Sequence, residues 1–304
     1  MIEARRLTKI YGDITAVSDL TFTVRPGIIT GFLGPNGAGK STTMRMIVGL
    51  HAPTSGTVTV GGRRYHDVPV PLREMGALLD ARAVHRGVTA RNHLLWLAAS
   101  NGIPRRRVDE VLGLVGLEAA ADRRAGQFSL GMAQRLGIAA ALLGNPAVLM
   151  LDEPLNGLDP EGIRWIRSFL RTLADEGRAV LLSSHLMSEM AMTADHLVVI
   201  GRGRIIADTS LADLVEQYSR ESVLVRTPQA DTFAAVLRDS GGSVQVNADS
   251  SLIVTGVTSV QIGSLASTAG VTLAELTPQR TSLEDVFMEL TSGLADHRAD
   301  GGAR

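Results

Sequence analysis

The sequence GFLGPNGAGKSTT, residues 31–43, matches the pattern G-x-x-x-x-G-K-[ST] at Gly34, Gly39, Lys40 and Ser41. Glycines in such a loop let backbone N–H groups turn toward phosphate oxygens, because no Cβ stands in the way. Lys40 can reach the β- and γ-phosphates as a compact point charge, and Ser41 can offer its hydroxyl to Mg²⁺. A helix that begins near Lys40 would point its N-terminus at the anion.

The surroundings of this loop favour a nucleotide site over a glycine-rich turn that contains a lysine by chance. Residues 28–33 are typical of a buried strand, and residues 42–50 of a helix with one apolar face. Only two of the 30 basic residues are lysines, Lys9 and Lys40. Arginine and lysine are not interchangeable, so a lysine at the one position that suits an ammonium supports the phosphate site.

Composition sets limits on the class of protein. The 304 residues, 45% of them hydrophobic, suffice for one large α/β domain and a small one. The net charge is −1 and no basic stripe occurs, so no nucleic-acid partner is expected. The sequence has no cysteine, which excludes a disulfide framework and a thiolate metal site and suits a reducing cytosol.

Neither a signal peptide nor a membrane span is expected. The N-terminal residues 1–12 lack an apolar core. The longest apolar run, residues 136–151, is too short to cross a bilayer and is interrupted at Asn145 and Pro146. We therefore expect a chain that is soluble by itself and that needs a partner for any membrane role.

The apolar pattern predicts a parallel core sheet with an inserted helical region at about residues 89–145. Residues 147–151 form a continuous apolar run of the kind found in buried parallel strands. Antiparallel strands are expected within residues 1–30 and a further strand at 55–62. The remaining predicted elements of this part are a helix at 161–176, a strand at 178–184, a helix at 188–194 and a hairpin at 196–208.

The composition changes around residues 211–220, and a second, smaller domain is expected beyond it. Its predicted elements follow the order βαββαβ, which is ferredoxin-like: 222–226, 230–239, 243–247, 251–255, 258–268 and 271–276. A last helix would begin at Ser282. The predicted domains are 1–218 and 219–291, with a disordered tail at 292–304.

Two carboxylates follow the predicted strand 147–151. Asp152 suits second-shell binding of Mg²⁺, and Glu153 suits the polarisation of an attacking water. An acidic turn after a strand is the alternative. The phosphate loop upstream favours the functional interpretation.

Three further motifs lie downstream. In FSLGMAQR, residues 128–135, Ser129 could simply cap a helix, or the exposed helix N-terminus could bind an anion. The second motif is NGLDP, residues 156–160. The third is LLSSH, which ends at His185. A lone histidine is usually structural, but this one follows a buried strand at the sheet edge where ligands bind in such folds.

Together these motifs resemble the nucleotide-binding domain of ATP-binding cassette (ABC) proteins, over about residues 2–215. The resemblance implies an α/β P-loop NTPase cassette with a RecA-like core, an antiparallel β subdomain and a helical subdomain. It also implies ATP and Mg²⁺ as cofactors. The nucleotide-binding loop, Walker A, would comprise Gly34, Pro35, Asn36, Gly37, Ala38, Gly39, Lys40, Ser41 and Thr42.

The resemblance also implies roles for the other motifs. Asp152 would be the Walker B aspartate and share Mg²⁺ with Ser41, Glu153 would be the catalytic base, and His185 would contact the γ-phosphate. Tyr11 would stack on adenine, although a strand-edge aromatic is the alternative. The signature loop would be Ser129, Leu130, Gly131 and Met132, and the D-loop Leu158 and Asp159.

Family members sandwich two ATP molecules between two cassettes, so a second copy of the chain is an expected partner and Ser129 would act in trans. Two departures from the family pattern occur. The signature reads FSLGM instead of the common LSGGQ. At the Q-loop position, within residues 75–84, Asp80 stands where glutamine is usual and would be a third Mg²⁺ ligand, unless it is a solvated loop residue in a shifted register.

Several classes of ABC protein compete. A soluble ABC protein that acts on ribosomes is disfavoured, because members of that type carry two cassettes in one chain and this chain has one. A DNA-repair type is disfavoured because those members insert a long coiled coil between Walker A and the signature, and this interval has no sustained heptads. An importer ATPase is the other alternative. The closing TSLEDVFMELT, residues 281–291, resembles exporter ATPases for drugs, antibiotics and lipids. The resemblance thus implies an ATPase at the cytoplasmic face of the cell membrane, bound to a separate ABC permease; the sequence does not identify the transported substrate.

Overall fold

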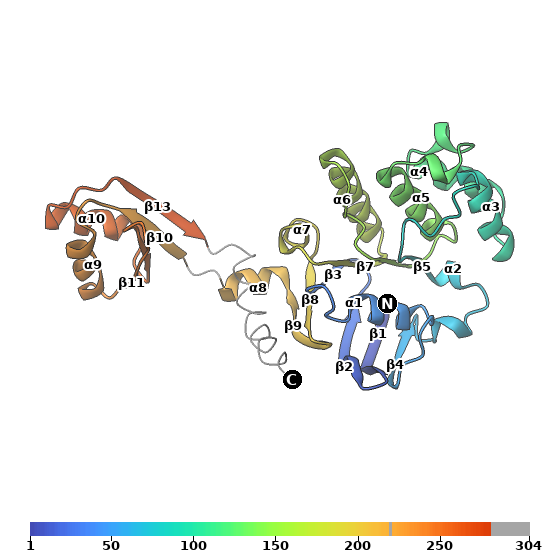
Figure 1. The fold of residues 1–304 in the computed structure, drawn as a ribbon, viewed down its shortest axis with the longest axis horizontal. Helices are drawn as coiled ribbons and strands as arrows, with labels where there is room; N and C mark the ends of the chain where they lie inside the picture. The colour runs from blue at the N-terminus through green and yellow to red at the C-terminus, as the bar shows by residue number, and fades with distance from the viewer. Residues whose placement is uncertain (219–220, 281–304) are drawn as a thin grey trace, which may run out of the picture. The chain divides into compact units, whose positions relative to one another are not determined.

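The computed structural model describes residues 1–218 and 221–280 (Figure 1). The helix expected from Ser282 and the expected tail lie outside these residues. The chain divides into two compact units, one covering Met1–Leu211 and the other beginning at Ala212. The division falls at the start of α8 (Leu211–Tyr218), whereas the expected boundary lay at its end. The domain assignment remains a prediction.

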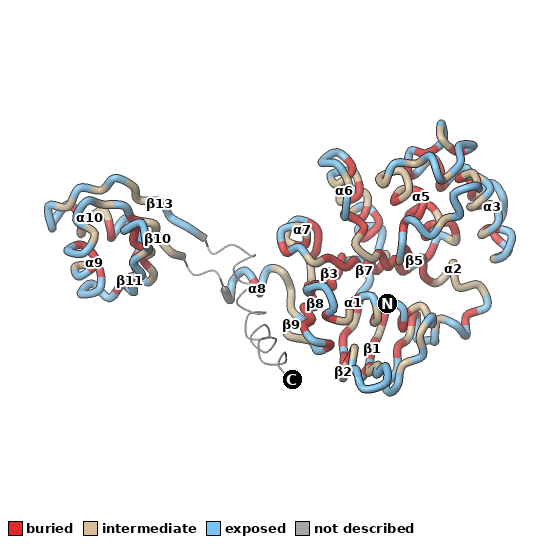
Figure 2. Tube along the Cα trace, in the orientation of Figure 1, coloured by how far each residue is buried: buried red, intermediate tan, exposed pale blue. Residues whose placement is uncertain are grey.

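A six-stranded sheet forms the centre of the first unit, in the order β5-β6-β7-β3-β8-β9. All neighbours are parallel except β8 and β9, which form the expected hairpin. Every residue of β3, β6 and β7 is buried, as expected for a sheet covered on both faces (Figure 2). The strands are β3 (Ile29–Leu33), β5 (Met75–Leu78), β6 (Val148–Leu151), β7 (Ala179–Ser184), β8 (His196–Gly201) and β9 (Arg204–Ser210).

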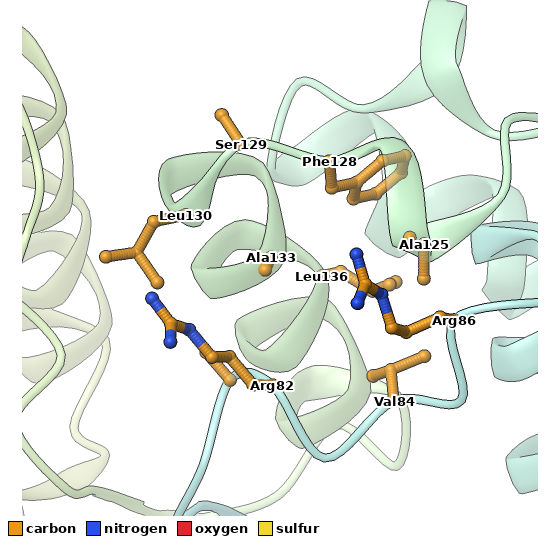
Figure 3. A pocket seen from close by; sticks show the side chains of 11 residues that line it. Arg82, Val84, Arg86, Ala125, Phe128, Ser129, Leu130, Ala133 and Leu136 are labelled. Atoms are coloured by element: carbon orange, nitrogen blue, oxygen red, sulfur yellow. The ribbon is translucent and has the colours of Figure 1, made fainter.

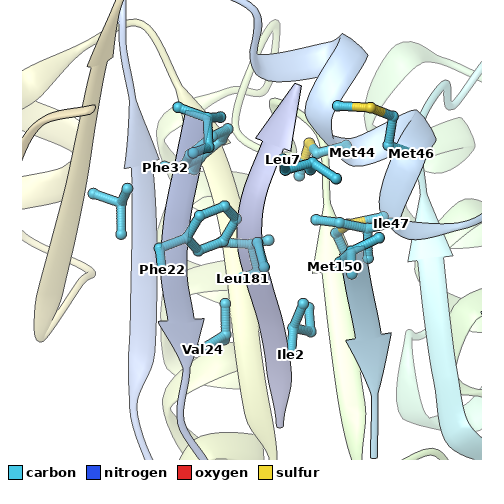
Figure 4. Close-up of a cluster of buried hydrophobic side chains, with 14 of the residues drawn as sticks. Ile2, Leu7, Phe22, Val24, Phe32, Met44, Met46, Ile47, Met150 and Leu181 are labelled. Atoms are coloured by element: carbon cyan, nitrogen blue, oxygen red, sulfur yellow. The ribbon is translucent and has the colours of Figure 1, made fainter. Parts of the chain in front are cut away.

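A three-stranded antiparallel sheet, β2-β1-β4, forms the predicted β subdomain. It consists of β1 (Ile2–Tyr11), β2 (Ile14–Val24) and β4 (Ser55–Val60). Its inward side chains share a core with α1 (Lys40–Ile47) and the central sheet (Figure 4). Phe22 stacks on Phe32 with ring centroids 5.4 Å apart, so this core holds β3 and the loop after it.

Helices account for the remainder of the first unit. The expected helical region contains α3 (Ala90–Ser100), α4 (Arg106–Leu114) and α5 (Leu130–Leu142). The other helices are α2 (Pro71–Glu74), α6 (Pro160–Asp175) and α7 (Met187–Ala191), with 3₁₀ turns at Tyr65–Asp67, Glu118–Ala120 and Ala125–Gln127. None of the described helices is long and apolar enough to cross a membrane.

The second unit has the predicted ferredoxin-like topology. Its sheet runs β11-β12-β10-β13 with every neighbour antiparallel. The buried Val225, Phe233 and Val254 belong to a core of its own. The elements are β10 (Glu221–Arg226), α9 (Ala230–Asp239), β11 (Ser243–Val246), β12 (Leu252–Thr255), α10 (Ser259–Ala269) and β13 (Glu275–Arg280).

The last strand begins later than the expected 271–276. Val271 and Leu273 are partly buried against the core without joining the sheet, so their apolar pattern reports burial rather than strand pairing. Strand β13 pairs with β10 through Leu276 and Pro278. Proline is tolerated there because β13 is an edge strand.

Candidate active site

The phosphate-loop candidate connects β3 to α1, and its glycines are required by close packing. A Cβ on Gly34 would lie 2.5 Å from the carbonyl oxygen of Ile200, and one on Gly39 would lie 2.7 Å from that of Ala16. Gly39 also has φ +105° and Gly37 φ +80°, values that side chains disfavour. The loop can therefore take this path only with glycine at these positions.

Backbone bonds hold the rest of the loop. The N–H of Ala38 donates to Pro35 O at 3.1 Å, and Ala38 O accepts from Gly203 N at 3.0 Å, which ties the loop to the turn between β8 and β9. Asn36 is exposed, and Thr42 is partly buried on α1.

Lys40, the first residue of α1, is only 6% exposed. Its ammonium donates to Gly34 O at 2.6 Å and to Pro35 O at 3.3 Å. Burial lowers the pKa of Lys40, although Glu153 and Asp152 act in the opposite direction. A lysine held in this way carries its charge at a desolvation cost that phosphate oxygens would offset.

Ser41 and Asp152 meet at the same edge of the sheet. The hydroxyl of Ser41 donates to Oδ2 of Asp152 at 3.0 Å, and the hydroxyl of Ser183 donates to the other carboxylate oxygen. Hydroxyl and carboxylate oxygens suit Mg²⁺, which in such sites is usually held by one or two protein oxygens together with substrate phosphates. Among the described residues, no three His, Cys, Asp or Glu side chains are grouped closely enough to hold a metal by themselves.

Glu153 has a strained backbone and a carboxylate fixed from two sides. Its φ is +47°, and its N–H donates to Ser183 Oγ at 2.9 Å. The carboxylate lies 2.8 Å from His185 Nδ1 and 3.7 Å from Lys40 Nζ. Backbone strain of this kind costs about 1–3 kcal/mol and often accompanies functional sites.

Ser183 is a site residue that sequence reasoning missed, since it bridges the two acidic residues by binding Asp152 and the backbone of Glu153. The available signal was the pair of buried serines, Ser183 and Ser184, that ends the otherwise apolar strand β7. The next residue, Ser184, donates to Glu189 at 2.8 Å and accepts from the N–H of Leu186 at 2.9 Å. These bonds fix the turn that carries His185.

The signature and D-loop candidates lie together. Ser129 caps α5 by accepting from Met132 N at 3.2 Å, and Asp159 caps α6 by accepting from Gly162 N at 2.8 Å. Leu130 covers Gly157, whose added Cβ would lie 2.2 Å from a Leu130 methyl group, and Gly131 faces Leu158. The two loops line one cavity of about 270 Å³. Within the described part of the chain, no hydrogen bond or ion pair joins them to Lys40 or Ser41.

Two further candidates lie at strand ends. Tyr11 ends β1 and is 42% exposed, with its hydroxyl 2.6 Å from Nδ1 of His51. Asp80 is an exposed residue two positions beyond β5, and its Oδ1 accepts from Arg82 N at 2.8 Å. The end of β5 adjoins the acidic pair, because Leu78 O accepts from Asp152 N at 2.7 Å.

A cavity of about 340 Å³ separates the segment after β5 from the start of α5 (Figure 3). Its apolar wall includes Val84, Phe128 and Leu136, while Arg82 and Arg86 supply charge. Neither arginine forms an ion pair with any described residue. We call this cavity the Arg82–Arg86 groove.

The fold and this site define a P-loop nucleoside triphosphate hydrolase. A glycine loop, a buried lysine and a serine hydroxyl follow strand β3, and an aspartate and a glutamate follow β6, which β7 separates from β3 in the same sheet. Comparisons with known proteins identify the branch. The family model described as ABC transporter matches residues 17–156. A second family model, a domain of unknown function (DUF8746), matches residues 221–284.

Two of the relatives described here match along nearly the whole chain, and a third matches about two thirds of it. The bacitracin transport ATP-binding protein BcrA of Bacillus licheniformis is 36% identical, over 96% of this chain and 98% of its own length. The Nod factor export ATP-binding protein I of Rhizobium sp. (strain N33) is 34% identical, over 95% and 96%. The lantibiotic transport ATP-binding protein SrtF of Streptococcus pyogenes is 36% identical, over 68% and 90%.

Solved structures share the cassette. An ATP-binding subunit of an ABC transporter is similar with a TM-score of 0.65 at 29% identity, over 72% of this chain and 93% of that one. A dimeric ATP-binding cassette in a post-hydrolysis state, bound to ADP and Pi, has a TM-score of 0.63 at 25% identity, over 69% and 99%. The chain belongs to the ABC transporter family; it binds ATP and is an ATPase.

Proposed function

We propose that this chain is the ATP-hydrolysing subunit of an exporter whose membrane permease is a separate chain. The observation that carries the proposal is the division of the site: Lys40, Glu153 and His185 converge at one place, whereas the signature loop opens elsewhere with the D-loop. Relatives named for bacitracin transport and Nod factor export support the exporter over a soluble ABC protein or an importer.

In the proposed reaction the chain's residues hold ATP and direct a water. The phosphate loop and Lys40 bind the triphosphate through backbone N–H groups and the ammonium. Mg²⁺, when bound, would neutralise phosphate charge, and Ser41 with Asp152 behind it would hold the ion. Glu153 accepts the proton of the attacking water as general base, while His185 keeps that carboxylate oriented and contacts the γ-phosphate.

The second half of each site comes from a second copy of the chain. Ser129 and Gly131 lie at the exposed N-terminus of α5, and a helix N-terminus favours anions. In the proposed sandwich, this end faces the ATP held by Lys40 of the other copy. Closure would exclude water and complete the phosphate contacts, and hydrolysis would reopen the pair.

The permease is proposed to dock at the Arg82–Arg86 groove, which would place the chain at the cytoplasmic face of the membrane. The groove adjoins both Asp80 and the signature loop, because Ala81 and Leu130 line it. Two arginines over an apolar wall favour a docking segment with apolar and acidic side chains. Binding of the permease in the groove would thus contact segments next to both Asp80 and the signature loop.

A mixing experiment tests the division of the site. Lys40→Ala removes ATP binding. Ser129→Asp retains a side-chain oxygen that can cap the helix but adds a negative charge that repels the γ-phosphate. Each variant alone should be inactive. Random pairing makes about half of the sandwiches mixed, each with one intact site of two, so mixing should restore about a quarter of wild-type activity. No restoration, with both variants folded, would contradict sites shared between copies.

A further inference from the structure

The end of β1 is fastened to the segment that follows α1. Thr54 donates its N–H to Thr8 O at 2.8 Å and accepts from Ile10 N through its hydroxyl at 3.0 Å. Lys9 donates to Ala52 O at 2.7 Å. The hydroxyl of Tyr11 lies 2.6 Å from His51 Nδ1. We call these two segments, Thr8–Tyr11 and His51–Thr54, the β1 clasp.

The clasp also connects Tyr11 to the phosphate loop. The N–H groups of Leu50 and His51 donate to Arg45 O at 2.9 and 3.2 Å, so the segment continues directly from the end of α1. Helix α1 begins at Lys40. A single rigid helix therefore lies between the phosphate-binding lysine and the histidine that holds the Tyr11 hydroxyl.

Two side chains fix the orientation of the Tyr11 ring. The Lys9 ammonium lies 5.0 Å from the ring centroid, a cation–π contact that covers one face. The His51 ring stands edge-on, with centroids 5.8 Å apart and an interplanar angle of 80°. Because 42% of Tyr11 stays exposed, the ring still has surface for a planar ligand.

We propose that His51 and Lys9 are positioning residues that hold Tyr11 for stacking on the base of the nucleotide. The inference rests on the proposed function, in which Tyr11 faces adenine. A tyrosine side chain that is free to rotate loses conformational entropy when it stacks on a base. Because the clasp already fixes the Tyr11 side chain in the free protein, that cost is not incurred on binding. Loss of one hydrogen bond should weaken ATP binding about 2- to 10-fold.

The test measures Kd for ATP and for inorganic triphosphate with the full chain. His51→Phe keeps a ring but removes the hydrogen-bonding nitrogen, and Tyr11→Phe removes the hydroxyl. Each should weaken ATP binding about 2- to 10-fold and leave triphosphate binding unchanged. His51→Asn, which retains a polar atom near the Nδ1 position, should restore affinity. The double variant should be no weaker than either single variant, since both remove the same bond.

His66→Phe is the matched control. His51 and His66 line one cavity of about 570 Å³, but Nε2 of His66 lies 2.9 Å from Oδ1 of Asp67 and no described contact joins His66 to Tyr11. This variant should bind ATP like the wild type. Lys9→Met keeps the stem and loses the charge, and should weaken ATP binding without affecting triphosphate binding.

The outcomes separate the inference from the proposed function. Weaker ATP binding in Tyr11→Ala with unchanged binding in His51→Phe would overturn the positioning role alone. Unchanged ATP binding in Tyr11→Ala would remove the stacking role on which it rests. Equal weakening of ATP and triphosphate binding in His51→Phe would indicate a general structural defect and would also overturn the inference, as would tighter ATP binding in Lys9→Met.

Discussion

Nδ1 of His185 lies 2.8 Å from Oε2 of Glu153, although the two residues follow different strands and are 32 positions apart. The parallel sheet brings them together, because β6 and β7 are neighbours and their carboxyl ends meet at one edge. Ser183 supports the pair from β7 by accepting the N–H of Glu153. The orientation of the candidate base therefore depends on β7 and the turn after it, in addition to β6, which it follows.

Replacing Glu153 with glutamine should separate binding from hydrolysis. Glu153→Gln keeps the size of the side chain but cannot accept a proton, so we expect hydrolysis to fall by about 10²–10⁴-fold while ATP still binds. Size-exclusion chromatography should then show an ATP-dependent dimer. Hydrolysis at the wild-type rate would exclude Glu153 as the base, and a variant that stays monomeric at high protein and ATP concentrations would weaken the sandwich.

The lowered pKa of Lys40 predicts that ATP binding depends on pH. Burial lowers its pKa in the free chain, and bound phosphate oxygens would raise it again because they favour the ammonium. The affinity for ATP should be highest at pH values below the pKa of Lys40 in the free chain. It should be lost as the pH rises through the higher pKa that Lys40 has in the complex. Between the two values binding takes up a proton, measurable by calorimetry in buffers of different ionisation enthalpy. Lys40→Arg stays charged throughout, so any residual binding should not vary with pH in this range.

Gly157 should resist substitution for two separable reasons. Its φ is +72°, and an added Cβ would lie 2.2 Å from Leu130. Gly157→Ala should lower the free energy of unfolding by about 2–4 kcal/mol in denaturant titrations. Gly27→Ala, with a similar φ of +78° and nothing within 4 Å, isolates the backbone cost. Adding Leu130→Ala should recover part of the loss; strict additivity would show that the two residues do not interact.

The second unit should be dispensable for nucleotide binding. Its buried side chains form a separate core, and within the described residues it carries no group that the proposed reaction uses. A chain ending at residue 218 should fold and bind ATP with unchanged Kd, measured with a fluorescent nucleotide. Folded protein that no longer binds ATP would show that the expected boundary is wrong. We predict that the second unit regulates the cassette or dimerises.

Much of the cassette could be predicted from the sequence because its signals are local. The glycine loop, the fully buried strands and the helix caps at Ser129 and Asp159 each depend on residues within a few positions. The βαββαβ order of the second unit was confirmed for the same reason. Local patterns sufficed to place each motif on its element.

Contacts between distant segments could not be predicted in this way. Ser183 binds residues 30 or more positions away, and His51 meets Tyr11 across 40 positions. Neither partner is encoded by spacing or periodicity. The start of β13 was misplaced for a related reason, since apolar alternation at Val271 and Leu273 indicates burial but does not say whether the backbone pairs with a neighbouring strand.

Asp80 offers the sharpest test of a departure from the family pattern. It lies two positions beyond the end of β5, whose Leu78 O accepts from the N–H of Asp152, a residue of the proposed Mg²⁺ site. Its Oδ1 is used in a local turn with Arg82 N. Aspartate is a stronger oxygen donor than glutamine but is one methylene shorter, so it could reach the ion through a water.

We expect Asp80→Ala to raise the Mg²⁺ concentration needed for half-maximal ATPase and to uncouple hydrolysis from transport, since the residue also adjoins the Arg82–Arg86 groove. Asp80→Gln, which restores the family's usual residue, should recover most of the function. A Mg²⁺ titration of ATPase activity in the assembled transporter compares both variants with the wild type. Arg82→Ala is a control for the Mg²⁺ dependence alone, because its backbone N–H remains and the bond to Asp80 can persist, whereas its side chain lines the groove proposed for the permease. If the Mg²⁺ titration curves of the Asp80 variants superimpose on that of the wild type and transport is unchanged, Asp80 is not a Mg²⁺ ligand. It is then a turn residue that accepts the N–H of Arg82.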